Sequence, residues 1–328
     1  MTRHTLGFLV ILALGFLMAL PTADAQRLGN IPLVGVLEPN PSTTPCFAAF
    51  QQGLRDLGYV EGQNIQFEYR YAANVVDRLL ALAAELVQRT PDVIWTHSPA
   101  AALATKQAIT TIPVVIGVSE GLLELGVVES LARPGGNLTG LDTQFIEHLG
   151  KRLALLKEAV PTIAHIAILV DPVNPLYQAV PHNIEREARA LGVQLQRVEA
   201  RGPEDFAGAF VTMVQGGADA LMLQGGPPFG GTHLPRLVEL AHRHRLPAIG
   251  IGRQHAEAGC LLAYGAPPLD LCQRSAVFVD KILQGAKPAD LPVERPRKFE
   301  LVLNLKAAQA LGLRIPPALL FQTDEVLR

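Results

Sequence analysis

Acidic side chains end short apolar runs in both halves of the sequence. Glu38 ends one such run, Glu120 follows a second and Asp171 follows a third. Thr44 and Ser98 each precede a proline and open a predicted helix, whose first backbone amides attract an anion. Amide donors combined with carboxylates predict a site for a zwitterion such as an amino acid.

The same three acids have other interpretations. Acidic residues after strands commonly cap the next helix or lie in solvent. Two carboxylates that face each other across a cleft could also cleave a glycosidic bond by acid and base chemistry. Acids at strand ends are too common to identify such a pair, so these alternatives stay open.

Motifs of other chemistries are missing from the sequence. The glycine-rich residues 225–231 and 250–252 complete neither a dinucleotide fingerprint nor a phosphate loop. His242 and His244 are two residues apart on a predicted helix, which places them on different faces and prevents metal chelation. No HExxH motif occurs. We therefore expect no catalytic residue, no cofactor and no metal.

The three cysteines, Cys46, Cys260 and Cys272, allow one disulfide at most. Their neighbours are apolar, which favours buried small side chains over redox or catalytic thiols. Whether any pair is bridged stays open at this point.

The N-terminus has the pattern of a secretory signal. Residues 6–20 are apolar, and Ala23-Asp24-Ala25 follows as a small-x-small cleavage site. The apolar stretch is shorter than the roughly 20 residues that span a bilayer. We predict a signal peptide at 1–25, cleavage after Ala25 and, since no cysteine follows the site directly, a protein without lipid in the periplasm.

Composition excludes several classes of protein. The 328 residues are 49% hydrophobic and 18% charged, which is typical of a globular chain. Lys and Arg number 28 against 30 Asp and Glu, a formal net charge of -2. This balance does not favour nucleic acid as a partner. We expect a monomer whose ligand is a small molecule.

Strand and helix patterns alternate along the chain. Strand patterns occur at 31–37, 65–71, 93–96 and 113–118, where 65–71 alternates between apolar and polar residues. Helical spacing at 47–57 and 75–88 and a helix after Ser98 separate them. Such an order predicts a parallel sheet with helices on both faces.

The order repeats in the second half at an almost constant offset, with Asp92 and its counterpart Asp219 separated by 127 residues. Three landmark pairs are each separated by 134 residues: Pro41 and Pro175, Gly58 and Gly192, and Pro113 and Pro247. We predict an α/β fold of two similar doubly wound parallel-sheet lobes, joined by a hinge that the chain crosses several times. We assign residues 26–140 and 265–298 to the N-terminal lobe and residues 141–264 to the C-terminal lobe. Residues 299–328 form a C-terminal crossing segment whose lobe stays open.

Ligands of open parallel sheets bind beyond the carboxyl ends of the strands. Six loops qualify here, three in each lobe, and we expect them to line one cleft. The candidate ligand-binding residues on or near these loops are Glu38, Asn40, Thr44, Ser98, Pro99, Ala100, Ser119, Glu120, Asp171, Asn174, Tyr177, Gln224, Gly225, Arg253 and Tyr264.

Three stretches resemble a known family. GYVEGQNIQFEYR at 58–70, LARPGGNLTG at 131–140 and the block at 286–320 are similar to ABC-transporter substrate-binding proteins, the family that includes tryptophan and tyrosine uptake receptors. The resemblance implies a type I periplasmic binding fold that closes on its ligand. It also implies an ABC permease and its ATPase at the inner membrane as partners.

The loop at 119–128 departs from the family's usual Asp-Pro pattern, so ligand identity is not carried over. The leading hypothesis is the substrate-binding component of an ABC importer for an amino acid or related carboxylate, without enzymatic activity. The alternatives are a periplasmic ligand-sensing module and a periplasmic hydrolase with carboxylates in the cleft.

Overall fold

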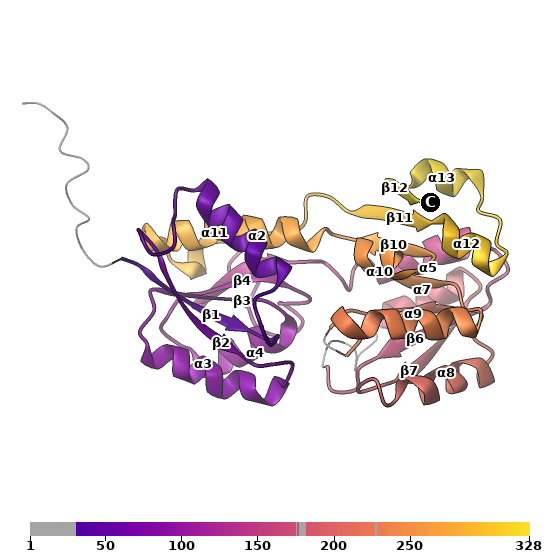
Figure 1. Ribbon diagram of the computed structural model, residues 1–328, viewed down its shortest axis with the longest axis horizontal. Coiled ribbons are helices and arrows are strands. Elements are labelled where there is room, and N and C mark those ends of the chain that lie inside the picture. The colour runs from indigo at the N-terminus through magenta and orange to yellow at the C-terminus, as the bar shows by residue number, and fades with distance from the viewer. Residues whose placement is uncertain (1–30, 175, 177–181, 227) are drawn as a thin grey trace, which may run out of the picture.

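Two α/β lobes lie side by side in the computed structural model (Figure 1). The structure describes residues 31–174, 176, 182–226 and 228–328. The predicted signal peptide and its cleavage site lie outside these residues.

The first lobe contains a five-stranded parallel sheet in the order β2-β1-β3-β4-β5. Its strands are β1 (Leu33–Glu38), β2 (Gln66–Tyr71), β3 (Val93–Thr96), β4 (Val114–Ser119) and β5 (Leu138–Asp142). Its helices are α2 (Pro45–Asp56), α3 (Leu79–Gln88), α4 (Pro99–Ala108) and α11 (Pro268–Leu283), with 3₁₀ turns η1 (Val76–Arg78) and η3 (Pro288–Asp290).

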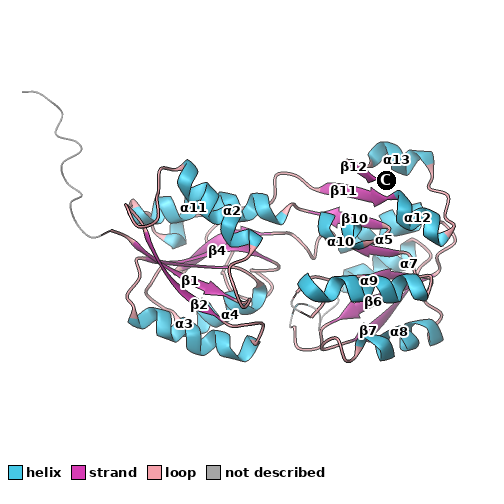
Figure 2. Cartoon of the chain, in the orientation of Figure 1, coloured by secondary structure: helices cyan, strands magenta, loops and turns pink. Residues whose placement is uncertain are grey.

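Alternating side chains of each strand bury both faces of this sheet. Val34 and Val36 of β1 pack in the same cluster as α2 and α11, whereas Leu37 packs in the cluster of α3 and α4. Figure 2 shows these helix pairs on opposite sides of the strands. The sheet is therefore doubly wound, as predicted.

The second lobe repeats the arrangement. Its sheet runs β12-β11-β10-β9-β8-β6-β7, so β7-β6-β8-β9-β10 matches β2-β1-β3-β4-β5. The strands are β6 (His165–Val170), β7 (Gln194–Glu199), β8 (Ala220–Met222), β9 (Ala248–Gly250), β10 (Leu262–Gly265), β11 (Glu300–Asn304) and β12 (Glu325–Leu327). The helices are α5 (Leu149–Ala159), α7 (His182–Ala190), α8 (Phe206–Gln215), α9 (Leu234–Arg243), α10 (Arg253–Ala258), α12 (Leu305–Leu311) and α13 (Pro317–Gln322), with the 3₁₀ turn η2 (Gly231–His233). The matched strand order confirms the two similar lobes predicted from the repeated pattern.

The C-terminal segment makes the second lobe larger. β11 pairs antiparallel with β10, and β12 pairs parallel with β11. Residues 300–327, whose lobe the sequence left open, thus extend the second sheet by two strands.

Three chain crossings join the lobes. The chain leaves β5 for α5, returns from β10 to α11, which packs on α2, and crosses again after η3 to reach β11. The last crossing runs beside the first, because Asp142 N donates to Glu294 O at 3.0 Å and Glu294 N donates to Gly140 O at 2.9 Å. These three crossings are the segments that we predict to act as the hinge.

Candidate functional site

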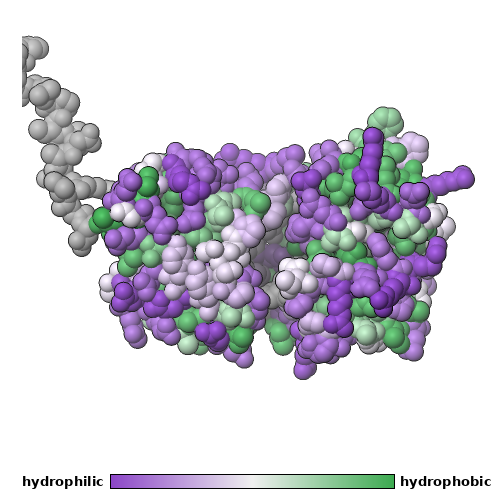
Figure 3. Space-filling model, in the orientation of Figure 1, coloured by the Kyte–Doolittle hydropathy of each residue, from purple (hydrophilic) through white to green (hydrophobic). Residues whose placement is uncertain are grey.

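A cleft of about 1150 Å³ lies between the lobes and is lined by residues of both. Figure 3 shows the hollow between the two halves of the molecule. The lining includes the ends of β1, β3 and β4 with their following loops, and the corresponding loops of the second lobe. It contains nine of the predicted residues: Asn40, Thr44, Ser98, Pro99, Ala100, Ser119, Glu120, Asp171 and Asn174.

Two helix N-termini of the first lobe open at this cleft with the same local design. Thr44 caps α2 and its Oγ1 accepts from Phe47 N at 3.3 Å, while Ser98 caps α4 and its Oγ accepts from Ala101 N at 3.4 Å. Proline follows each cap and carries no N–H. The second amide of each helix, at Cys46 and Ala100, is therefore the one left for a ligand.

Ser98 adopts a backbone conformation that disfavours most side chains. Its φ is 82°, in the region that glycine enters without cost. The strained residue turns the chain from the end of β3 directly into α4 at the cleft. Strain of this kind at a cleft is typical of a residue that positions a ligand-binding group.

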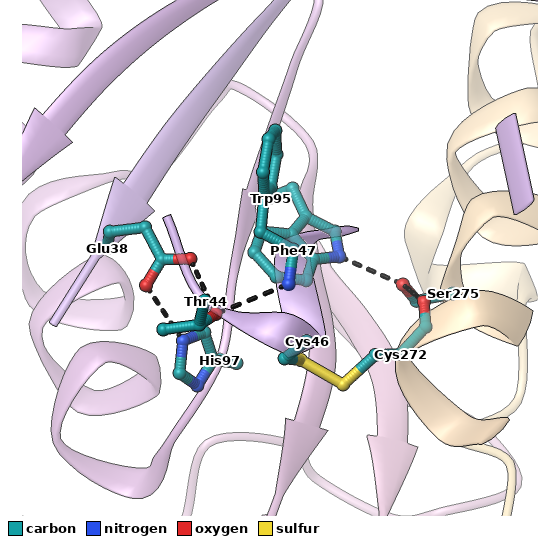
Figure 4. Close-up of a disulfide and its surroundings, with 8 residues drawn as sticks. All are labelled: Glu38, Thr44, Cys46, Phe47, Trp95, His97, Cys272 and Ser275. Atoms are coloured by element: carbon teal, nitrogen blue, oxygen red, sulfur yellow. Dashed lines mark hydrogen bonds and ion pairs between the residues drawn. A yellow bond between two sulfur atoms is a disulfide. The ribbon is translucent and has the colours of Figure 1, made fainter. Parts of the chain in front are cut away.

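Glu38 supports this wall from behind and does not line the cleft. Its side chain is fully buried; Thr44 Oγ1 donates to Oε1 at 3.0 Å, and His97 Nε2 pairs with Oε2 at 2.9 Å. Figure 4 shows the carboxylate between these two side chains. Its oxygens hold the loops that precede α2 and α4, so Glu38 does not lie on the cleft surface as expected.

A disulfide fixes the first turn of α2. Cys46 and Cys272 of α11 are bridged at an S–S distance of 2.00 Å (Figure 4). Next to the bridge, Trp95 Nε1 donates to Ser275 Oγ at 2.9 Å. Cys260 is buried with a free thiol, and burial raises its pKa to about 12. The bridge answers the question that the sequence left open, and the buried thiol carries little thiolate.

The opposite wall carries Asp171 and Asn174. Asp171 is 8% exposed; its Oδ1 accepts from Val173 N at 3.0 Å, and burial raises the pKa of the carboxyl. Asn174 Oδ1 accepts from Leu176 N at 3.1 Å. One oxygen of each side chain shapes the loop, as in an Asx turn. Both residues line the cleft.

Glu120 reaches the second lobe at Gly225. A Cβ atom placed on Gly225 would lie 2.8 Å from Glu120 Oε1 and 2.7 Å from Ile251 Cδ1. Glycine thus permits close approach of the two lobes at this point. Gly225 itself is outside the lining of the cleft, in contrast to the expectation.

Three further predicted residues in the described part of the chain do not line the cleft. Gln224 is buried, at 2% exposure. Arg253 Nη2 bonds Glu325 Oε1 at 2.8 Å, because α10 directs this side chain toward the C-terminal strand β12. Tyr264 stacks on Phe299 with ring centroids 5.9 Å apart. Tyr177 lies outside the described residues.

The most informative residue that the sequence analysis missed is Arg152 of α5. It lines the cleft although only 2% is exposed, and its Nε donates to Tyr264 O at 2.9 Å. Its Cζ lies 4.4 Å from the centroid of the Phe145 ring. A signal was present in the sequence: Arg152 falls on the helical face of Leu149, Leu153 and Leu156, so its charge had to lie at the core side.

Further residues of the walls were not among the fifteen named candidates, although some lie on the six expected loops. They include His97, Thr143, Arg201, Thr232, His233 and Gln254. Val76, Leu80 and Leu103 add an apolar patch on the first lobe. No group of three His, Cys, Asp or Glu in the described ranges could hold a metal ion.

The sequence matches the family described as ABC transporter substrate binding protein over residues 34–327. The chain belongs to this family. Members are binding proteins, so membership confirms the predicted family and the predicted binding role in place of an enzyme.

Three relatives illustrate the likeness. The tyrosine-binding protein of Clostridioides difficile (strain R20291) is 23% identical over 291 residues, which cover 89% of this chain and 83% of the relative. The crystal structure of an ABC domain from Streptococcus pneumonia in complex with L-Trp matches with a TM-score of 0.82 at 22% identity. The match covers 91% of this chain and 100% of that chain. A conserved domain protein from Vibrio cholerae O1 biovar El Tor has a TM-score of 0.82 at 24% identity, covering 90% and 100%. These likenesses confirm the two-lobed fold of type I periplasmic binding proteins.

Proposed function

We propose that this substrate-binding protein binds an amino acid or a related small carboxylate in the cleft between the lobes. The observation that carries the proposal is the buried guanidinium of Arg152 in the cleft wall. A guanidinium is charged at any physiological pH and matches a carboxylate in shape. The helix N-termini at Thr44 and Ser98 add partial positive charge on the facing lobe.

Carboxylates in the same cleft suit the ammonium group of an amino acid. Glu120 comes from the first lobe and Asp171 from the second, and both line the cavity. The relatives that bind tyrosine and L-Trp support an amino acid as the ligand. The apolar patch of Val76, Leu80 and Leu103 would contact the ligand's side chain.

A screen of ligands tests this proposal directly. The protein is heated with each of the 20 proteinogenic amino acids, with short alkanoic acids and with hexoses, and the melting temperature is recorded. A ligand that binds the native state raises that temperature by mass action. We expect at least one amino acid to do so, with its affinity measured by calorimetry. Stabilisation by hexoses alone would contradict a carboxylate ligand.

We further propose that the protein acts in the periplasm and delivers its ligand to an ABC permease and its ATPase. The apolar stretch and cleavage site at 6–25 support export. The Cys46–Cys272 disulfide also supports it, since disulfides persist in oxidising compartments. Within the described ranges, no helix is long and apolar enough to cross a bilayer.

Two measurements test location and role. The intact mass of periplasmic protein should correspond to a chain that starts at Gln26; a retained Met1 or an attached lipid would contradict the cleavage proposed. Reconstituted permease vesicles should take up radiolabelled ligand only when the binding protein is present. Binding without stimulated uptake would instead favour a sensing role.

A further inference from the structure

We propose that Arg152 both binds the acid group of the ligand and transmits this binding to the hinge between the lobes. The inference rests on the proposed function for the nature of the ligand. Its second half, the link to the hinge, rests on contacts within the protein.

Arg152 contacts two of the three chain crossings at once. Its Nε donates to the carbonyl oxygen of Tyr264, where the chain leaves β10, at 2.9 Å. Its guanidinium lies over the ring of Phe145, on the crossing from β5 to α5, at 4.4 Å from Cζ to the centroid. One side chain therefore connects both segments to the cleft wall.

An aromatic cluster extends this connection to the third crossing. His148 precedes α5, Tyr264 is the penultimate residue of β10 and Phe299 precedes β11, so each ring lies on or next to a different crossing. The ring centroids lie 3.9 Å apart for His148 and Phe299, 5.9 Å for Tyr264 and Phe299, and 5.7 Å for His148 and Tyr264. A displacement of Tyr264 would shift the rings of His148 and Phe299 as well, because closely packed rings do not move independently. All three crossings would then be affected.

The charge of Arg152 acts in a desolvated setting. Burial, and then the nearby guanidinium, lower the pKa of His148, and the same guanidinium contributes to the lowered pKa of His255. The two imidazoles consequently stay neutral beside a cation at neutral pH. Coulomb interactions are stronger in such a setting than in water. A ligand carboxylate at this wall would be held firmly by the cation.

Ligand binding would then bias the orientation of the lobes. When a carboxylate pairs with the guanidinium from the cleft side, the positions of Nε and of the Tyr264 carbonyl are restrained together. An interaction that differs between two lobe orientations shifts their populations. Binding of a ligand to Arg152 would in this way change the conformation that the hinge favours.

The test uses the full mature protein with spin labels on two exposed positions far from the cleft, Gln88→Cys on α3 and Val211→Cys on α8. Electron-spin resonance gives the distance distribution between the lobes. L-Tyrosine and L-leucine serve as probes, and their primary amides lack the negative charge. The variants are Arg152→Met, Arg152→Lys and, as a matched control, Lys151→Met, which removes an exposed charge from the next position of the same helix.

We expect an acid probe, and not its amide, to shorten the distance between the lobes in the wild type. Arg152→Met should bind that acid roughly 10- to 100-fold more weakly and show a broader distance distribution even without ligand. Arg152→Lys keeps the charge but loses the Nε bond, so it should recover affinity more than it recovers the distance shift. Lys151→Met should match the wild type.

Two results would overturn the inference. One is a distance distribution of Arg152→Met that equals that of Lys151→Met both with and without probe. The other is full recovery of affinity and distance by Arg152→Lys, which would reduce the role to charge alone. If neither acid binds the wild type, the proposed ligand class fails for these probes. The distributions without ligand still decide the link to the hinge, which a broadened Arg152→Met distribution supports and an unchanged one refutes.

Discussion

Cys46 and Cys272 are 226 residues apart in the sequence and are joined by a disulfide at the first turn of α2. The bridge ties a helix whose N-terminus opens at the cleft to α11, which the chain reaches only after its second crossing. The loop at 39–45, which faces the cleft, is therefore covalently tied to α11.

Removal of this bridge should lower stability. We expect Cys46→Ser with Cys272→Ser to reduce the free energy of unfolding by about 2–5 kcal/mol, since the unfolded chain regains the freedom of a long loop. Reductant should lower the melting temperature of the wild type and leave that of the double variant unchanged. Cys260→Ala, which changes the free thiol, should stay sensitive to reductant; insensitivity of the wild type would show that the bridge contributes nothing.

Gly225 should tolerate no larger side chain. Gly225→Ala places a methyl group against Glu120 Oε1 and Ile251 Cδ1, and overpacking of this kind costs about 1–3 kcal/mol. Because Glu120 lines the cleft, ligand affinity measured by calorimetry should fall as well. Gly208→Ala on α8 meets nothing within 4 Å and serves as control; it should keep affinity and gain up to about 1 kcal/mol of stability. Equal behaviour of the two variants would contradict close contact of the lobes at Gly225.

Two variants of Asp171 should distinguish its role in ligand binding from its role in the structure of the loop. Asp171→Asn keeps an acceptor for Val173 N but removes the charge, whereas Asp171→Ala removes both. If the carboxylate binds the ligand's ammonium group, both variants should weaken affinity by roughly 10- to 100-fold. Only the alanine variant should lose about 1 kcal/mol of stability. An unchanged dissociation constant in Asp171→Asn would remove this residue from the site.

His255 should make stability depend on pH. Both ring nitrogens lack a hydrogen bond to the described residues, and burial lowers the pKa of the imidazole to about 4. The unfolded chain, with a pKa near 6.5, binds a proton first as the pH falls. Stability should therefore decrease from about pH 6.5 to about pH 4 by up to about 3 kcal/mol and then level off for this group.

The matched variants for this prediction are His255→Phe and His244→Asn. The first removes the titrating group from the core, so chemical denaturation at pH 7 and pH 4.5 should differ by less than in the wild type. The second changes an exposed histidine and should keep the wild-type difference. A slope unaffected by His255→Phe would show that other groups carry the pH dependence.

Local patterns were sufficient to predict the lobes. Strands such as β1 and β6 are continuous apolar runs, and helices such as α2 start with a capping hydroxyl and proline. These signals depend only on neighbouring residues in the chain. Their repetition in the second half, with three landmark pairs at an offset of 134 residues, predicted two lobes of similar fold. Loops after parallel strands converge at one edge by geometry, which is why nine predicted residues line the cleft.

Orientation of individual side chains depended on contacts distant in sequence. Arg253 follows the carboxyl end of β9, where ligand-binding residues of such sheets lie. Its guanidinium nevertheless bonds Glu325 on β12 and not a ligand in the cleft. Glu38 ends β1 at the right edge, yet Thr44 and His97 hold its carboxylate beneath the wall. Arg152 became a cleft residue because α5 packs its apolar face on the core and leaves the guanidinium between Phe145 and Tyr264. Sequence alone thus determined the elements and the cleft, whereas tertiary packing decided which charges face it, since a buried charge takes its position from partners that only the folded chain brings together.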